Sequence, residues 1–370
     1  MANNNDKKVL NVPDLRFPEF SGEWVETELQ DIVPNICSGK DRISNSGEVA
    51  LYGSTGVIGR TNSASYKENI VLVARVGANA GQMQIGNAPC GVTDNTLVID
   101  AKEWNYYIYY FLQHYNLNRL VFGSGQPLIT GGMLKRIKVR YGCKAERNNI
   151  TRLLCLIDER IATQNKIIED LKKLKSAIIE IEYSPKDSYH SHIGGAIVQI
   201  SKRNKDNHLC NVLSVSNRQG FIKQSEQFED RNVASDDTSN YKIVEKNDFA
   251  YNPARINVGS IARLTKFETG IVSPMYICFR TKDCLLPEYL ELFFESRNFF
   301  YHIQKRLEGS VRLCLSYEEL CNIPIVIPSI EKQKQVDLHL SKLAQKIDLE
   351  MKILQFVQQQ KTYLLHQMFI

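Results

Sequence analysis

Arginine, asparagine and glutamine side chains, together with lysines and small hydroxyl residues, gather in loop-like segments at two places in the chain. Arg, Asn and Gln can form paired hydrogen bonds to base edges, and Lys, Ser and Thr suit phosphate oxygens. These residue types predict DNA reading, although any one of them alone is better explained as a solvated turn residue. The first set is Lys40, Arg42, Tyr52, Ser54, Thr55, Arg60, Arg75, Asn79, Asn95 and Gln126. The second set is Asn217, Arg218, Lys223, Arg255, Asn257, Ser260, Arg263 and Arg312.

Catalytic motifs are missing from the same segments. Residues 53–59 have the wrong glycine spacing for a dinucleotide loop, and residues 76–82 lack the Gly-Lys-Ser/Thr of a phosphate loop. Residues 251–255, Tyr-Asn-Pro-Ala-Arg, resemble the Asn-Pro-Pro-aromatic motif of adenine methyltransferases but lack the second proline and the aromatic residue. The nine cysteines form no CxxC and no Cys/His quartet with zinc-ligand spacing. We therefore expect a non-catalytic chain with no metal site and no cofactor of its own.

The composition is that of an ordinary globular protein, with 43% hydrophobic and 24% charged residues. The formal net charge of +5 permits a polyanionic partner without requiring one. The opening residues, MANNNDKK, are polar, and no apolar run is long enough to span a bilayer. Scattered unpaired cysteines are typical of a reducing compartment, so we expect a cytoplasmic protein.

The elements that must position the two sets of residues are themselves repeated. Residues 123–140 return as residues 309–326, each with a Gly-Ser pair, a small hydroxyl residue, a leucine and an alternating apolar strand. The offset is a constant 186 residues, which is too long a period for a solenoid and indicates a duplicated domain. The matched positions are Thr130 and Ser316, and Leu134 and Leu320.

The segments before these positions repeat more loosely. Residues 69–81 and 247–259 each predict a strand followed by a Gly/Asn-rich loop with one arginine. A second strand is predicted at 91–99 and 271–279, and then an aromatic helix at 104–115 and 289–300. The framework matches while the loops differ, which is the pattern expected of two copies that read different targets on one scaffold.

Two long helices follow the repeated domains. Apolar residues spaced alternately by four and three form a heptad seam, typical of a coiled coil. A polar residue in such a seam fixes the register, so we predict an antiparallel pair in which Lys175 faces Glu350 and Gln164 faces Lys361. A parallel pair would set Lys175 against Lys361. The seam positions are Ile157, Ile161, Gln164, Ile168, Leu171, Lys175 and Ile178, and then Ile347, Glu350, Leu354, Val357, Lys361, Leu364 and Met368.

The predicted fold is α+β, with two duplicated α/β recognition domains joined by a long antiparallel two-helix coiled-coil spacer and related by a pseudo-twofold axis. The predicted boundaries are 1–145 for the first domain with an N-terminal arm, 146–183 for the first spacer helix, 184–329 for the second domain and 330–370 for the second spacer helix. A helix of roughly 35 residues is on the order of 50 Å long. Two domains at that spacing suit half-sites about one to one and a half turns of B-DNA apart.

In this order and duplication, the chain resembles the specificity subunits of type I restriction-modification systems. The resemblance covers residues 12 to 370 and is carried by Pro13-Asp-Leu-Arg-Phe-Pro-Glu-Phe-Ser-Gly-Glu-Trp24, by residues 51–59 with 77–81, and by residues 363–369. The second domain departs from the usual Tyr-Gly turn, because residues 215–220 read Val-Ser-Asn-Arg-Gln-Gly.

The resemblance implies that each target-recognition domain reads one half of a split DNA target and that the helices set the gap. It implies two methyltransferase (M) subunits, which use S-adenosylmethionine, and restriction (R) subunits, which use ATP with Mg. The exposed faces of the two helices are the expected docking surface for M. The open alternatives are a stand-alone nuclease or methyltransferase and a coiled-coil scaffold that binds no nucleic acid.

Overall fold

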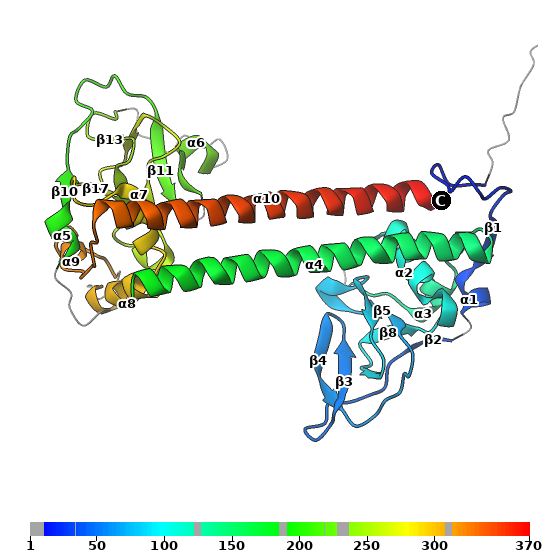
Figure 1. Ribbon diagram of the computed structural model, residues 1–370. Coiled ribbons are helices and arrows are strands. Elements are labelled where there is room, and N and C mark those ends of the chain that lie inside the picture. Colours follow the sequence, from blue (N-terminus) through cyan, green and yellow to red (C-terminus); the bar gives the residue numbers. More distant parts are fainter. Residues whose placement is uncertain are drawn as a thin grey trace, which may run out of the picture. The chain divides into compact units, whose positions relative to one another are not determined.

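A computed structural model describes residues 11–33, 35–121, 127–184, 191–217, 219–227, 237–307 and 313–370 (Figure 1). The chain divides into two compact units, of which unit 1 is Met1–Lys166 with Lys352–Ile370 and unit 2 is Ile167–Met351. Each unit contains sheets together with parts of two long helices, α4 (Lys144–Glu182) and α10 (Ile330–Met368). No helix in the described part of the chain combines the length and the apolar character needed to cross a membrane.

Unit 1 contains a four-stranded sheet of order β2-β8-β5-β6, a three-stranded sheet of order β4-β3-β7 and a two-stranded ladder, β1-β9. All pairs are antiparallel except β3 with β7. The elements are β1 (Val25–Glu28), α1 (Leu29–Ile32), β2 (Ile36–Ser38), β3 (Val49–Gly53), β4 (Gly56–Thr61), β5 (Ile70–Ala74), η1 (Gly77–Asn79), β6 (Met83–Gly86), β7 (Cys90–Val92), β8 (Thr96–Ile99), η2 (Lys102–Trp104), α2 (Asn105–Tyr115), η3 (Leu117–Leu120), α3 (Gly131–Lys135) and β9 (Lys138–Tyr141).

Unit 2 contains two four-stranded sheets, of order β10-β17-β14-β15 and β12-β11-β16-β13. All pairs are antiparallel except β11 with β16. The elements are α5 (Ile193–Ala196), β10 (Ile197–Ile200), β11 (Val212–Ser216), β12 (Gly220–Lys223), α6 (Gln224–Gln227), β13 (Lys242–Glu245), β14 (Phe249–Tyr251), η4 (Ile256–Val258), β15 (Ile261–Arg263), β16 (Thr269–Val272), β17 (Ile277–Thr281), α7 (Pro287–Phe293), α8 (Arg297–Arg306) and α9 (Tyr317–Cys321).

The duplication predicted from the sequence is confirmed by the strand order. The sheet β10-β17-β14-β15 repeats β2-β8-β5-β6, and β12-β11-β16 repeats β4-β3-β7 with the parallel pair in the same place. Strand β13 has its counterpart in an isolated antiparallel bridge between Tyr66 and Cys90, next to β7. One scaffold therefore occurs twice, with local additions.

The repeated hydroxyl residue begins a short helix in both units. The side-chain oxygen of Thr130 accepts a hydrogen bond from the Met133 N–H at 3.2 Å, and that of Ser316 accepts one from the Glu319 N–H at 3.1 Å. Such a cap satisfies an N–H group that has no partner within the helix. The leucine four residues after each cap is fully buried. The two Gly-Ser pairs, at 123–124 and 309–310, lie outside the described residues.

Four predicted elements differ from the structure. Residues 91–99 and 271–279 are not single strands, because Thr93-Asp-Asn95 and Ser273-Pro-Met-Tyr276 form turns that carry the chain from one sheet to the other. The predicted helix 289–300 is two helices, α7 and α8, because the side chain of Ser296 caps a new helix start. No strand forms at 323–326, where Pro324 lacks an N–H and makes only an isolated bridge to His192.

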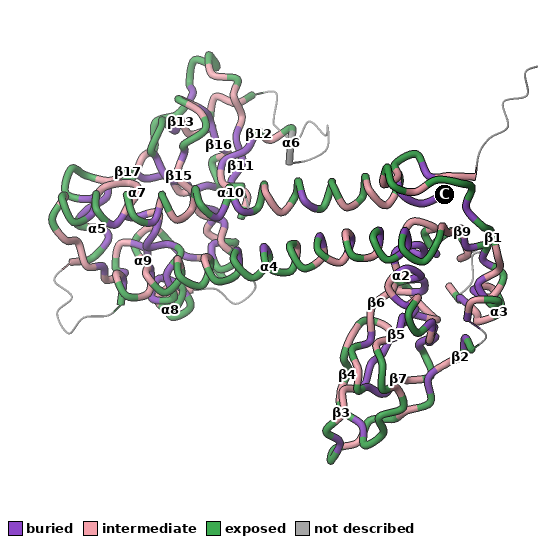
Figure 2. The backbone as a smooth tube through the Cα atoms, turned by 45° about the vertical axis from the view of Figure 1, so that its right-hand side comes forward, coloured by how far each residue is buried: buried purple, intermediate pink, exposed green. Residues whose placement is uncertain are grey.

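All residues of strand β5 are buried (Figure 2), and the strand separates two cores of unit 1. Val71 and Val73 belong to a core shared with α2 and with the ends of the long helices. Ile70 and Leu72 belong to a second core, which also contains Tyr52. Alternate side chains of a strand point to opposite faces, so a continuous apolar run suits a strand covered on both sides.

The long helices run antiparallel within each unit. In unit 1, Ile150 and Leu154 near the start of α4 share a core with Met368 at the end of α10. In unit 2, Ile179 near the end of α4 shares a core with Val336 near the start of α10. Every predicted seam position is buried or half-buried.

The predicted register of the two helices is wrong at both of its polar pairs. Lys361 forms an ion pair with Asp158 at 2.6 Å, six residues before its predicted partner Gln164. Lys175 forms an ion pair with Glu295, beyond the end of α7, at 2.6 Å, and not with Glu350. A heptad pattern repeats every seven residues, so partners on other elements decide among registers that the pattern leaves equal.

The N-terminal arm is fastened to both long helices within unit 1. The guanidinium of Arg16 donates two hydrogen bonds to the carboxylate of Glu146, at 2.6 and 2.9 Å, near the start of α4. The Leu15 N–H donates to the Gln367 carbonyl near the end of α10 at 2.9 Å. The hydrogen bonding of Arg16 to the Glu146 carboxylate is the main cause that raises the pKa of Arg16. The Arg-Phe-Pro opening of the chain therefore has a structural role.

Candidate nucleic-acid interface

Three loops of unit 1 meet at one edge of its sheets. The Ser54 hydroxyl, in the β3–β4 turn, donates to the Asn95 carbonyl at 3.1 Å. The Arg75 N–H, after β5, donates to the same carbonyl at 3.0 Å. The Arg75 guanidinium donates to the Ser38 hydroxyl at the end of β2, at 3.3 Å. Residues predicted from separate segments are thus brought together, with Thr55 exposed in the same turn.

More of the first set lies beside this cluster. Lys40 and Arg42 are exposed in the segment after β2, and the neighbouring Gly39 N–H donates to the Thr96 carbonyl at 3.0 Å. Asn79 is half-buried in η1. Gln126 lies outside the described residues; its neighbour Pro127 accepts a hydrogen bond from the Gly77 N–H at 3.0 Å.

Two residues of the first set are placed elsewhere. The ring of Tyr52 is buried in the second core, and its hydroxyl accepts a hydrogen bond from the Asn87 N–H at 3.2 Å. Arg60 faces Ala50 at the end of the hairpin away from the turn, and its guanidinium donates to the Glu48 carbonyl at 3.0 Å. The structure therefore gives Tyr52 a packing role and separates Arg60 from the loop cluster.

Unit 2 presents the corresponding loops with different chemistry. Asn217, Arg255 and Asn257 are exposed in the β11–β12 turn and in the loop around η4. Asn217 and Arg255 line a small recess of ≈ 40 Å³, together with Ser260. The Ser260 hydroxyl is buried and donates to the Val215 carbonyl at 3.2 Å, so this side chain holds the loop in place. Arg218 and Arg312 lie outside the described residues.

Arg263 and Lys223 do not join these loops. The Arg263 guanidinium is only 13% exposed and pairs with Glu288 and, at 2.9 Å, with Glu291, both on α7. It also donates to the Asn247 side chain at 3.0 Å, so its Nε and Nη1 donors are engaged within unit 2. Lys223 faces Leu213, at the end of its hairpin away from the Asn217 turn.

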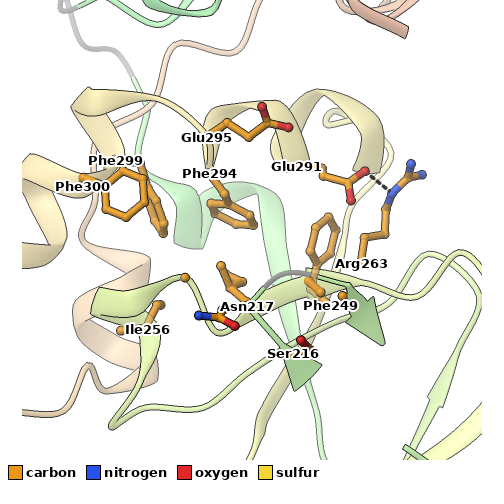
Figure 3. A pocket seen from close by; sticks show the side chains of 14 residues that line it. Ser216, Asn217, Phe249, Ile256, Arg263, Glu291, Phe294, Glu295, Phe299 and Phe300 are labelled. Carbon is orange, nitrogen blue, oxygen red and sulfur yellow. Dashed lines mark hydrogen bonds and ion pairs between the residues drawn. The ribbon is translucent and has the colours of Figure 1, made fainter. Parts of the chain in front are cut away.

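A cavity of ≈ 490 Å³ lies between Arg263, the Asn217 turn and the helices α7 and α8 (Figure 3). Phenylalanines, including Phe294, line much of it. Burial raises the pKa of Glu291, and the neighbouring Arg263 opposes this shift. The second carboxylate of the cavity, Glu295, pairs with Lys175. No cluster of three potential metal ligands occurs among the described residues.

The two reading loops are closed by the same backbone hydrogen bonds. The Ala74 N–H donates to the Gln82 carbonyl at 2.8 Å, and the Asn252 N–H donates to the Ser260 carbonyl at 3.0 Å. Likewise, Ile129 donates to the carbonyl of Arg75, and Leu315 to the carbonyl of Pro253. Pro253 is therefore the counterpart of Arg75, and Arg255 lies two residues further along. The units present their arginines at different points of one scaffold.

The residue pattern did not single out the large apolar side chains at the same edges. Val57 and Ile58 follow the β3–β4 turn and are 58% and 47% exposed. From the sequence, these two apolar residues predicted only that a strand follows the turn, and not that their side chains are exposed. The sequence feature that could have identified them is the position of two β-branched residues close after the polar Ser54–Thr55 turn.

Comparisons with known proteins agree with this arrangement. Residues 21–182 match the model of the type I restriction modification DNA specificity domain. The fold is similar to that of the S subunit of a type I restriction-modification system from M. genitalium, with a TM-score of 0.64 and 16% identity over 97% of this chain and 99% of that chain. It is also similar to a chain of a structure described as the basis of complex assembly and conformational transition of the type I R-M system, with a TM-score of 0.52 and 12% identity over 95% and 98%. No curated protein matched the sequence.

Proposed function

Because residues 21–182 of this chain match the type I restriction modification DNA specificity domain, we propose that its two units each read one half of a bipartite DNA target. The observation that carries the proposal is one scaffold present twice with different side chains in equivalent loops. A specificity subunit is a non-catalytic component, so DNA reading, rather than bond chemistry, is the task of these loops. The two long helices would fix the gap between the half-sites.

The proposed partners are double-stranded DNA, two M subunits and, in the full complex, R subunits. Exposed apolar residues on the long helices support docking of M. On α4 within unit 2, Ile167, Leu174 and Ile181 recur every seven residues and are 39%, 50% and 71% exposed. On α10 within unit 1, Phe356 and Tyr363 have the same spacing and are 69% and 58% exposed. A seven-residue apolar stripe is the pattern by which one helix packs on another.

The chemistry would belong to the partners. M subunits would use S-adenosylmethionine to methylate adenine, and R subunits would use ATP with Mg, while this chain would hold no cofactor. The proposed place of action is the cytoplasm, to which nine free cysteines are suited.

The deciding experiment is to express the chain with its M subunit in a methylation-free host and to map N6-methyladenine by single-molecule sequencing. A split motif with a fixed gap is the expected result. If an intact complex forms and no split motif is methylated, the two-reader proposal is wrong.

Changing the reading loop of unit 2 is expected to alter one half of the motif only. Arg255→Ala with Asn257→Ala removes two exposed side chains that suit base edges. Each lost base contact should cost about 1–3 kcal/mol of discrimination, which relaxes one half-site by tenfold or more. Methylome mapping is the measurement. Lys246→Ala, directly after β13, is the control for loss of a positive charge, because Lys246 pairs with Glu268 and lies outside the η4 loop. Equal relaxation of both halves would contradict the assignment of unit 2 to one half.

Binding of the complex to DNA is expected to weaken steeply with salt. If about four phosphates are contacted, the binding constant should fall on the order of 10²-fold between 50 and 200 mM salt, because contacted phosphates release counterions. Fluorescence anisotropy over a salt series measures the slope. A flat dependence would favour a scaffold that binds no nucleic acid.

A further inference from the structure

Exposed apolar side chains sit at the DNA-reading edge of unit 1. Val57 and Ile58 lie directly after the Ser54–Thr55 turn, which touches the Asn95 loop. Ile43, which follows Lys40 and Arg42, is 61% exposed. Val57 and Ile58 lie in β4, where β-branched residues are common, so the feature that needs an explanation is their exposure at this edge.

The local geometry presents these side chains instead of burying them. A β-bulge between Leu51 and Tyr52 interrupts the register of the hairpin, and Val57 faces Tyr52. Ile58 packs over Gly53, where an added Cβ atom would lie 2.9 Å from its Cγ2. Ile43 covers Gly59 in the same way, at 3.6 Å. Ile58 and Ile43 therefore pack against the backbone of the two glycines. More than half of the Val57 side chain stays exposed to solvent.

Unit 2 carries exposed apolar residues at the same edge, but on different loops. Val258 is 52% exposed and lines the recess beside Asn217 and Arg255. Met275 is 55% exposed in the turn after β16, whose parallel neighbour β11 ends at Ser216. The corresponding turn of unit 1 carries Asn95. The exposed apolar residues thus lie on different loops in the two copies, and Met275 stands in the turn where unit 1 carries Asn95.

The chemistry of the major groove offers one apolar group on the base edges, the C5-methyl of thymine. A two-stranded β-ribbon fits that groove, and β3 with β4 forms such a ribbon at its turn. Arginine, asparagine and hydroxyl side chains surround the exposed apolar residues, as suits a nucleic-acid partner. A protein partner would be expected to cover a larger apolar patch than these few side chains provide.

We propose that Val57 and Ile58 read thymine methyl groups in the half-site of unit 1, and that Val258 and Met275 do so in the half-site of unit 2. This inference rests on the proposed DNA-reading function and names the residues that set part of its specificity. Since the apolar residues lie on different loops in the two units, the thymines they read should occupy different positions within the two half-sites.

The test uses the full complex with M on duplexes of the mapped motif, in which each thymine is replaced in turn by deoxyuridine. Removing one contacted methyl should weaken binding by the wild type about fourfold. Val57→Thr keeps the shape and β-branching and replaces a methyl by a hydroxyl. In this variant the thymine-to-uracil difference should vanish at thymines of one half-site only. Val258→Thr should abolish it in the other half.

Val25→Thr is the matched control, because Val25 is a valine of β1 in the same unit with 57% exposure. The inference is overturned if no thymine in either half shows a methyl effect, if neither half contains a thymine, or if Val57→Thr weakens thymine and uracil duplexes equally. Loss of M binding by Val57→Thr with DNA binding intact would also overturn it, in favour of a protein contact. Failure of the proposed function itself would appear earlier, as the absence of a methylated split motif.

Discussion

Arg16→Ala is expected to lower the free energy of unfolding of unit 1 by about 3–5 kcal/mol, because it leaves a buried carboxylate without its partner. The side chain of Glu146 is 1% exposed, and both of its oxygens accept hydrogen bonds from Arg16. For a unit of this size the melting temperature should fall on the order of 10 °C. Both tryptophans, Trp24 and Trp104, lie in unit 1, so their fluorescence reports its unfolding.

The controls separate an unpaired buried charge from the mere loss of a contact. Arg140→Ala removes an arginine whose partner, Glu26, is on the surface, and little change is expected. Adding Glu146→Gln to Arg16→Ala removes the stranded charge and should restore part of the stability. If Arg16→Ala is as mild as Arg140→Ala, the arm does not depend on this pair.

Phe356→Glu is expected to weaken docking of the M subunit on the order of 100-fold and to leave stability nearly unchanged. Phe356 is 69% exposed, so its loss opens no cavity in the fold. A large aromatic residue at the centre of an interface can carry 2 kcal/mol or more, and a carboxylate there would be buried unpaired. Titration calorimetry with purified M measures the affinity, and adenine methylation in the host should disappear in parallel.

Gln358→Glu adds the same charge to an exposed position about 200° further around the helix, at 100° per residue. It should dock normally. Equal loss of affinity in both variants would indicate a general charge effect, and normal docking of Phe356→Glu would move the interface away from this stripe.

Much of the fold could be predicted because it depends on local chemistry. A hydroxyl residue directly before a helical turn is a common helix cap. The equivalence of Thr130 and Ser316 could therefore be recognised from the sequence. A heptad pattern similarly marks which residues of the long helices are buried. The register of the two long helices could not be predicted from the heptad pattern. Lys361 pairs with Asp158 and Lys175 pairs with Glu295, and these partners come together only in the folded chain.

The candidate site shows the same division. The loops that hold Arg75, Asn95 and Ser54 were identified from their residue types, and the hydrogen bonds that gather them follow from the strand order. The engagement of Arg263 could not be foreseen, since its glutamates are 25 and 28 residues away in sequence. Whether an arginine is free to bind DNA depends on such distant partners.

The matching loop closures have a consequence for how new specificities arise. The spans 74–82 and 252–260 have equal length, and in each a hydrogen bond joins the N–H of the first residue to the carbonyl of the last, although their sequences differ. These closing bonds join backbone groups, so they do not depend on the side chains of the span, although the Ser260 hydroxyl adds a bond to the Val215 carbonyl. Recombination that moves one span into the other copy, within or between genes, would therefore keep the framework intact. Evolution can treat these nine-residue segments as exchangeable cassettes and change a half-site in one genetic step.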